Sequence, residues 1–260
     1  MKLSLVIPCY QEDHTINEIL ELIYKQHIPV EYEIVLIDDG SDIPVKECID
    51  ADHFKDNLKL YRFRRNQGKG CAVQMGIKKS SGDYVLIQDA DLEYLPKDIP
   101  TLLQPVLDHD APVVFGSRFM VKPKNIRASH NFGNKLLNKI NNLLFNCNLT
   151  DFETGYKLIK RSLLLSLDLK SREFELEPEI TGKLLRRGIK IIELPIYYRY
   201  RVKGQAKISF LDGIEAILQI LLLRVFYESK LMQWLYSIYK FHAKKIINKI
   251  RRNLFSSRRF

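Results

Sequence analysis

Apolar, strand-like runs alternate with helix-like stretches along most of this chain, and this alternation restricts the folds it can adopt. We predict strands at residues 2–7, 32–37, 58–63, 84–88, 112–115 and 190–194, and helices at about 14–27, 67–80, 97–108, 132–146 and 175–187. Strands separated by helices usually pair in parallel, so the pattern predicts an α/β fold with a mostly parallel sheet and helices on both faces.

Polar residues follow three of the predicted strands. They are Pro8, Tyr10 and Glu12 after the first, Asp38, Asp39, Gly40 and Ser41 after the second, and Asp89, Asp91 and Glu93 after the fourth. Ligands of parallel α/β sheets bind outside the carboxyl ends of the strands. The three strand ends are therefore expected to meet at one crevice.

The acidic residues after the fourth strand have the pattern of a metal site. On an extended backbone, residues two apart point the same way, so Asp89 and Asp91 can converge on one cation. Oxygen ligands favour Mg²⁺ or Mn²⁺ over Zn²⁺. The alternative is a solvated acidic turn, since so short a motif often occurs by chance.

Two further motifs point to an anionic ligand. Asp39 lies in a turn-like Asp-Asp-Gly-Ser sequence, where a carboxylate can either shape the turn or hydrogen-bond ribose hydroxyls. The sequence Asn-Gln-Gly-Lys-Gly around Lys69 opens a helix, where backbone amides and a lysine can approach an anion. The glycine-rich fingerprints of dinucleotide-binding enzymes and P-loop NTPases are missing from the sequence, which argues against both classes.

Composition predicts one large domain with a basic appendage. The chain has 260 residues, 46% of them hydrophobic, and four cysteines without the spacing of a disulfide framework or a zinc site. The net charge of +10 is concentrated at the end: residues 240–260 contain eight Lys or Arg and no Asp or Glu. We predict a catalytic domain at 1–210 and a basic, membrane-associating segment at 211–260.

The end of the chain has the pattern of a helix that lies in a membrane surface. Leu231, Trp234, Leu235, Ile238 and Phe241 recur at helical spacing, with lysines and tyrosines beside them. The alternative is a terminal helix packed on the domain's own core. The apolar run at 216–223 is too short to span a bilayer, and the first residues lack the layout of a signal peptide. We therefore expect a cytoplasmic protein that is peripheral at the inner membrane face.

Several motifs together resemble, in order and spacing, the inverting family 2 glycosyltransferases, in particular the dolichol-phosphate mannose synthase-like group. They are Val-Ile-Pro-Cys-Tyr-Gln-Glu at 6–12, Ile-Asp-Asp-Gly-Ser at 37–41, Asn-Gln-Gly-Lys-Gly at 66–70, Asp-Ala-Asp-Leu-Glu at 89–93, Gly-Ser-Arg-Phe at 116–119, Thr-Gly-Tyr at 154–156 and the glutamate-rich 173–179. The resemblance implies a Rossmann-like GT-A fold, a nucleotide-diphosphate sugar donor, GDP- or UDP-linked, and Mg²⁺ or Mn²⁺ as cofactor.

The resemblance also implies roles for single residues at the donor side. Asp91 would ligate the metal directly, and Asp89 would lie on the ribose, sugar or metal side. Glu93 departs from the pattern of this group, which commonly has glutamine at its position, and whether it serves as a third ligand, direct or through water, stays open. The nucleotide pocket would be lined by Pro8, Tyr10, Glu12 and Asp39, with Lys69 also at the donor.

On the acceptor side two chemistries stay open. A polyprenyl phosphate is already an anion and needs no base; the resemblance then implies phosphate binding by Ser117, Arg118 and Arg127. A glycan hydroxyl would need a carboxylate base, for which Glu175 and Glu177 are the candidates. The plain alternatives are a surface ion pair for Arg118 and an exposed, dipole-favoured helix start for the glutamates, Glu179 included.

Residues 197–207 alternate aromatic and basic side chains without helical periodicity, which predicts an extended loop. In relatives this region closes over donor and acceptor, and closure would bring Arg201, Lys203 or Lys207 to the diphosphate. The same composition suits RNA, but no RNA-binding signature accompanies it, so we expect no nucleic-acid partner.

The sequence thus predicts a metal-dependent inverting transferase that moves a sugar from a nucleotide donor to a polyprenyl-phosphate or other lipid-linked acceptor. The alternatives are transfer to a glycan hydroxyl in polysaccharide assembly, or a catalytically silent nucleotide-sugar-binding module. The motifs make no prediction about oligomeric state.

Overall fold

The computed structural model of the chain describes residues 1–50, 53–54, 56–120, 128–173, 175–199 and 224, and for residues 128–136 it describes the backbone alone. Its elements, in chain order, are β1 (Lys2–Cys9), α1 (Ile16–Tyr24), β2 (Glu31–Asp38), α2 (Val45–Cys48), β3 (Leu58–Arg62), α3 (Lys69–Lys79), β4 (Tyr84–Ile87), the 3₁₀ turn η1 (Pro96–Asp98), α4 (Ile99–His109), β5 (Val113–Ser117), α5 (Ala128–Phe145), β6 (Lys157–Lys160), α6 (Arg161–Ser166), α7 (Leu176–Arg186) and β7 (Ile192–Pro195). The predicted strands and helices all appear, with shifted ends.

The strands form one seven-stranded sheet in the order β3-β2-β1-β4-β6-β5-β7. The pairs β3–β2, β2–β1, β1–β4 and β5–β7 are parallel, whereas β6 is antiparallel to both of its neighbours. The predicted α/β fold with a mostly parallel sheet is confirmed. The prediction was wrong to omit β6, a short strand that follows a turn and leads directly into α6.

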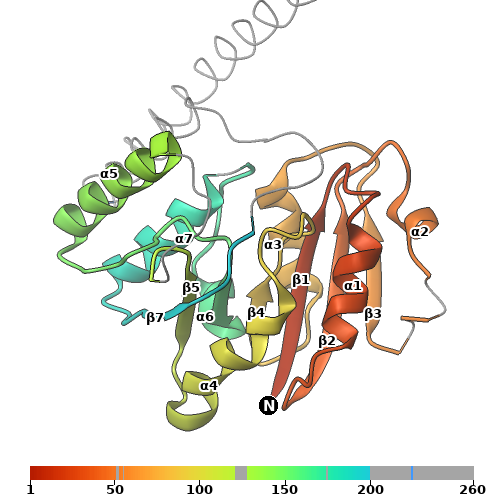
Figure 1. Ribbon diagram of the computed structural model, residues 1–260, viewed down its shortest axis with the longest axis horizontal. Helices are drawn as coiled ribbons and strands as arrows, with labels where there is room; N and C mark the ends of the chain where they lie inside the picture. The colour runs from red at the N-terminus through yellow and green to blue at the C-terminus, as the bar shows by residue number, and fades with distance from the viewer. Residues whose placement is uncertain (51–52, 55, 121–127, 174, 200–223, 225–260) are drawn as a thin grey trace, which may run out of the picture.

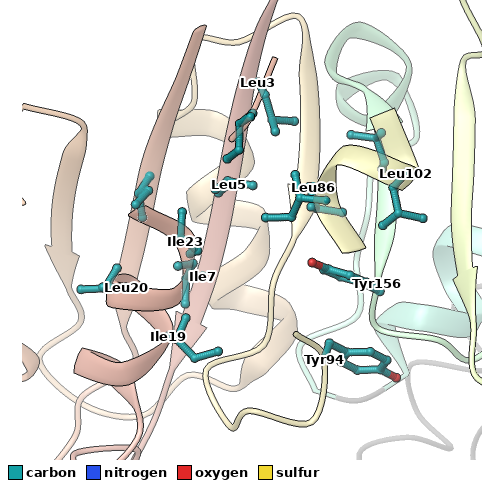
Figure 2. Packing of buried hydrophobic residues seen from close by; sticks show 14 of the residues in the cluster. Leu3, Leu5, Ile7, Ile19, Leu20, Ile23, Leu86, Tyr94, Leu102 and Tyr156 are labelled. Carbon is teal, nitrogen blue, oxygen red and sulfur yellow. The ribbon is translucent and has the colours of Figure 1, made fainter. Parts of the chain in front are cut away.

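Helices cover both faces of the sheet (Figure 1). One apolar cluster joins the sheet to α1 and α4, and a second joins the opposite face to α3, α6 and α7. The alternation along β1 explains this division, because Leu3, Leu5 and Ile7 belong to the first cluster and Val6 to the second. Figure 2 shows Ile19 and Ile23 of α1 directed at this row of β1 side chains.

The reversed direction of β6 decides what lies at the functional end of the sheet. Because β6 runs against β4, its first residues lie beside the carboxyl end of β4, with Leu86 opposite Leu158. The Thr154-Gly155-Tyr156 sequence, which leads into β6, therefore lies beside the carboxyl end of β4. Figure 2 shows Tyr156 next to Tyr94, and their rings stack with centroids 5.5 Å apart.

Some predictions fall outside the described residues: Arg127, the loop beyond Arg199 with Lys207, and the amphipathic helix from Leu231 onward. The division at residues 210 and 211 lies there too and stays a prediction. Within the described ranges, none of the helices has the length and apolar character needed to cross a membrane.

Candidate active site at the carboxyl end of the sheet

The acidic turn after β4 is held by a buried glutamine. The side-chain amide of Gln88 donates hydrogen bonds to the carbonyl oxygens of Asp89 and Tyr94, each 3.0 Å long. Inside the turn, Asp91 Oδ1 accepts the N–H of Glu93 at 3.1 Å, and Leu92 has a positive φ of 64°. The turn is thus fixed from within and presents its carboxylates beyond the strand end.

Lys69 brings three distant segments together. Its ammonium lies 2.8 Å from Asp89 Oδ1 and 2.8 Å from Glu177 Oε1. Lys69 is the first residue of α3, Asp89 follows β4, and Glu177 is in the first turn of α7. Three residues that the sequence nominates separately therefore form one cluster, which we call the Lys69 cluster.

Electrostatics keep the lysine of this cluster charged. Burial alone would lower the pKa of Lys69, but the charges of Asp89 and Glu177 outweigh it and raise that pKa well above its ordinary value. The second oxygen of Asp89 lies against Gly155, where a Cβ atom would come within 2.7 Å of it. Asp89 is therefore enclosed on two sides, by an ammonium and by the backbone that leads into β6.

Asp39 fixes the loop that carries Lys69. Its carboxylate accepts the backbone N–H groups of Gln67 at 2.8 Å and Gly68 at 2.9 Å, together with the side-chain amide of Asn66 at 3.0 Å. Burial raises the pKa of Asp39, and the two backbone hydrogen bonds oppose that shift. In this structure the carboxylate therefore positions the loop before α3; its predicted contact with the nucleotide stays a prediction.

The same loop is packed too tightly for any side chain at Gly68. Gly68 has φ 100°, and a Cβ there would collide with the carbonyl oxygen of Arg172. We expect Gly68→Ala to lower the free energy of unfolding by about 3 kcal/mol, because both the backbone conformation and the overlap are unfavourable. Urea unfolding measures this value.

Gly188 supplies a matched control for that prediction. It also has a positive φ, 66°, but a Cβ there meets nothing within 4 Å. Gly188→Ala should cost only about 1 kcal/mol, the conformational part alone. Equal costs at the two positions would contradict the argument from packing at Gly68.

Arg118 forms a buried ion pair rather than the surface pair considered above. Its Nε and Nη2 atoms donate to the two carboxylate oxygens of Asp151 at 2.7 and 2.6 Å, and its backbone N–H donates to the same group at 3.0 Å. Asp151 is 1% exposed. Burial opposes the charge of Arg118, but Asp151 outweighs it and raises the arginine's pKa. Its predicted phosphate contact stays a prediction.

Glu93 is tied to the segment after β7. Tyr198 donates its hydroxyl to Glu93 Oε2 at 2.8 Å, and the N–H of Arg199 donates to the Glu93 carbonyl at 2.9 Å. Tyr94 pairs with Tyr198 in an isolated antiparallel bridge, and their ring centroids lie 5.6 Å apart. The acidic turn is therefore joined to the start of the predicted loop at 197–207.

Two ionisable residues beside this crevice were missed by the sequence analysis. Burial raises the pKa of Glu153 to about 7, a shift that Arg118 opposes and Asp151 reinforces. Burial lowers the pKa of Lys157 to about 7, and its ammonium donates to the carbonyl oxygens of Phe152 and Thr154. Their positions directly before and after the Thr-Gly-Tyr motif at 154–156 were the available clue.

Stability should depend on pH through Glu153. Its folded pKa of about 7 lies above the ordinary value of 4.5, so the folded state binds this proton more tightly than the unfolded chain does. The resulting stability is complete below pH 4.5 and is lost as the pH rises towards 7. Glu153→Gln mimics the protonated form, so its melting temperature should exceed that of the wild type at pH 8. Near pH 5 the gap should shrink, and a gap independent of pH would contradict the assignment.

The other nominated residues lie at the same end of the sheet. Pro8 is within β1 opposite Ile37, and Tyr10 follows the strand. Glu12 holds the turn that leads into α1, since its carbonyl accepts the N–H groups of Thr15 and Ile16 and its carboxylate accepts the Thr15 hydroxyl.

The alternative of an exposed helix start for the glutamates is wrong. Glu175, Glu177 and Glu179 are 5%, 8% and 2% exposed. Glu179 accepts the backbone N–H groups of Lys170 and Ser171 and pairs with Lys183 at 2.6 Å, so it holds the chain that enters α7.

The acidic turn offers oxygen donors of the kind that a hard divalent metal takes. Among the described residues, no group of three His, Cys, Asp or Glu side chains is arranged to hold an ion, so Asp89, Asp91 and Glu93 do not form a ready-made cage. Magnesium sites commonly use one or two carboxylates and complete their shell with water and substrate phosphates. Oxygen donors on a fixed turn beyond a strand end fit that kind of site.

Comparisons with known proteins agree with this geometry. Glucosyl-3-phosphoglycerate synthase from Mycobacterium tuberculosis, solved with Mn²⁺, UDP-glucose and phosphoglyceric acid, matches with a TM-score of 0.65 at 20% identity, over 85% of this chain and 79% of that chain. The likeness shows the fold. A mostly parallel sheet of this order, with an acidic turn at the end of its central strand, is the GT-A fold.

Sequence relatives identify the family to which the chain belongs. The family model described as glycosyl transferase family 2 matches residues 4–167, and the chain belongs to that family. A dolichol-phosphate mannosyltransferase from Pyrococcus furiosus is 27% identical over 80% of this chain, although the match spans only 60% of that protein. A Methanocaldococcus jannaschii protein of uncharacterised function is 28% identical over 83% of this chain and 96% of its own length.

Proposed function

We propose that this glycosyltransferase moves a sugar, with inversion, from a GDP- or UDP-linked donor to a polyprenyl-phosphate or other lipid-linked acceptor. The observation that carries the proposal is the Lys69 cluster, which joins the acidic turn after β4 to the helix starts of α3 and α7. The carboxyl end of the sheet thereby brings carboxylates and an ammonium together. A diphosphate and its counter-ion need these groups together.

The donor would lie over the ends of β1, β2 and β4. Pro8, Tyr10, Glu12 and Asp39 would surround the nucleotide, and Lys69 at the start of α3 would face the diphosphate. Asp89 would orient the ribose or the sugar. The fixed loop around Gly68 supports this arrangement, because it sets the direction in which the lysine leaves the helix.

Asp91 would hold the metal, with Asp89 and Glu93 as further ligands, direct or through water. Bound there, Mg²⁺ or Mn²⁺ would neutralise the charge that builds on the departing nucleoside diphosphate. The neighbour's Mn²⁺ and UDP-glucose support a role of this kind, and the fixed turn at Asp91 supplies a suitable oxygen donor.

The pairing of Glu177 favours an acceptor that is already an anion. The Glu177 carboxylate lies 2.8 Å from the Lys69 ammonium, so it would have to leave this ion pair before it could take a proton from a hydroxyl. A phosphate monoester needs no base and could attack the anomeric carbon directly. Arg118 and Arg127 are the proposed phosphate-binding residues.

The relative from Pyrococcus furiosus supports the same acceptor class, since its name specifies a dolichol phosphate. Transfer to a glycan hydroxyl remains the second candidate, with Glu177 as the base once Lys69 has moved. In that case Glu177→Gln should stop transfer while Arg127→Ala leaves it intact, and a phosphate acceptor should give the reverse.

The first experiment is transfer from a panel of radiolabelled GDP- and UDP-sugars, with Mn²⁺, to polyprenyl phosphate. Label in the organic phase would identify donor and acceptor together. Release of nucleoside diphosphate only when a hydroxylated glycan is supplied would establish the second candidate. No release with any donor would overturn the enzymatic proposal and leave a binding role.

Membrane association is proposed for the basic segment at 211–260. Deleting residues 229–260 should release the protein from vesicles that contain anionic lipid, because the deleted stretch carries the cationic and aromatic residues. Co-sedimentation with and without the deletion, compared at low and high salt, measures the effect. Unchanged co-sedimentation of the shortened protein would contradict the assignment.

A further inference from the structure

In the Lys69 cluster the ammonium of Lys69 contacts Asp89, which is also one of the proposed metal ligands. Asp89 Oδ1 is 2.8 Å from the lysine nitrogen, which is the contact length of an ion pair with a hydrogen bond. A divalent ion and an ammonium cannot both sit on this oxygen, because like charges repel strongly at such range. Lysine and metal are therefore expected to compete for Asp89.

We propose that Lys69 serves as a built-in cation of the donor site, neutralising Asp89 in the free enzyme and yielding that position when a divalent ion arrives with the diphosphate. The inference rests on the proposed function, since it requires a metal-bound donor. In addition to its contact with the donor, Lys69 would thereby make binding of the divalent ion depend on binding of the diphosphate.

The structure confines this exchange to one side chain. The backbone before Lys69 is held by Asp39, which accepts the N–H groups of Gln67 and Gly68. The backbone after it is held where the N–H of Cys71 donates to the carbonyl of Arg172 at 3.3 Å. The flexible four-carbon stem of the lysine can therefore move its ammonium while the loop stays in place.

Glu177 gives the displaced ammonium a partner. Its carboxylate lies 2.8 Å from the same nitrogen, so the lysine remains paired after it leaves Asp89, and its other N–H groups can turn to the phosphate oxygens. Since Asp89 and Glu177 both touch one nitrogen, the two carboxylates lie close together. Without the lysine they would repel each other, and a cation would relieve that repulsion.

Two consequences for metal binding follow. The wild-type enzyme should bind Mn²⁺ weakly when no nucleotide is present, because the ion must displace Lys69 from Asp89. The nucleoside diphosphate should strengthen Mn²⁺ binding, since it offers the ammonium new oxygens and completes the metal's ligand shell. By linkage, Mn²⁺ should strengthen nucleotide binding by the same factor.

The test is a titration of Mn²⁺ without nucleotide, followed by electron paramagnetic resonance of the free ion. Lys69→Met should bind Mn²⁺ at least about tenfold more tightly than the wild type, within the usual range of coupling between sites. Lys69→Arg keeps the positive charge and should resemble the wild type. Equal or weaker binding by Lys69→Met would overturn the inference.

Two controls make this result specific. Adding Asp91→Asn to Lys69→Met should remove the gain; a gain that survives would place the ion in an artificial site between Asp89 and Glu177, and would overturn the inference. Thermal unfolding checks that each variant is folded. Should Lys69→Met unfold, Lys69→Gln, which keeps a polar side chain, gives the same comparison.

A further arm separates the two proposals. In the wild type, Mn²⁺ is titrated with GDP or UDP present. If neither nucleotide strengthens Mn²⁺ binding, the proposed donor site is wrong, and the inference fails with it. If either does so while Lys69→Met binds Mn²⁺ alone no better than the wild type, the donor site stands and only the role of Lys69 is wrong.

Discussion

Asp91→Asn should lower kcat by at least about a thousandfold, or about 4 kcal/mol in the barrier, while the protein stays folded. The substitution removes the charge that a divalent ion needs. The turn should survive, because an amide oxygen at this position can still accept the N–H of Glu93 that Asp91 Oδ1 accepts at 3.1 Å. Steady-state release of nucleoside diphosphate, measured at saturating Mn²⁺, gives the rate.

Asp83→Asn is the matched control for that prediction. Asp83 is exposed and lies just before β4, at the opposite end of the strand, where its carboxylate accepts the N–H of Lys2 at 2.8 Å. The same chemical change there should alter kcat by less than about twofold, since surface substitutions away from a site have small effects. Near-normal turnover by Asp91→Asn would refute the metal assignment.

Asp151→Ala should lower the free energy of unfolding by about 3–5 kcal/mol, because it leaves the guanidinium of Arg118, whose side chain is only 15% exposed, without its bidentate partner. The lost contacts also include the backbone N–H of Arg118. Chemical unfolding at pH 7 measures the change, with circular dichroism to show that the variant begins folded.

An exposed ion pair provides the comparison. Lys2 and Glu31 lie 3.1 Å apart, and the Glu31 side chain is 73% exposed. Glu31→Ala should cost no more than about 1 kcal/mol, since water and salt screen such a pair. If Asp151→Ala cost no more than Glu31→Ala, the burial of the Arg118–Asp151 pair would not add to its contribution to stability.

The sequence analysis succeeded where local pattern decides structure. The apolar runs of β1 and β4 predict strands, and the place of the acidic residues after β4 follows from the rule that sites lie at strand ends. Lys69 was nominated because it opens a helix after a glycine. These features depend on neighbouring residues, which a single sequence displays.

The sequence analysis missed features that depend on residues far apart in the chain, even where it had named one of the residues. The contact of Lys69 with Glu177 joins residues far apart in the chain, and nothing near either one indicates it. The burial of Glu179 and the pairing of Arg118 with Asp151 also arise from tertiary packing, so local reasoning offered exposed positions instead. Strand β6 was missed because it is short and runs directly into α6.

The place of β6 in the sheet bears on how the chain is made. β4 pairs with β1 on one side and with β6 on the other, yet β6 is synthesised long after β4, with β5 and α5 between them. On the ribosome, the buried strand Tyr84–Ile87 therefore keeps one unpaired edge until residues 157–160 emerge. Open apolar edges invite pairing with other chains. Newly made copies of this enzyme should accordingly depend on chaperones during that interval, and premature termination before β6 should yield aggregates rather than a smaller soluble domain.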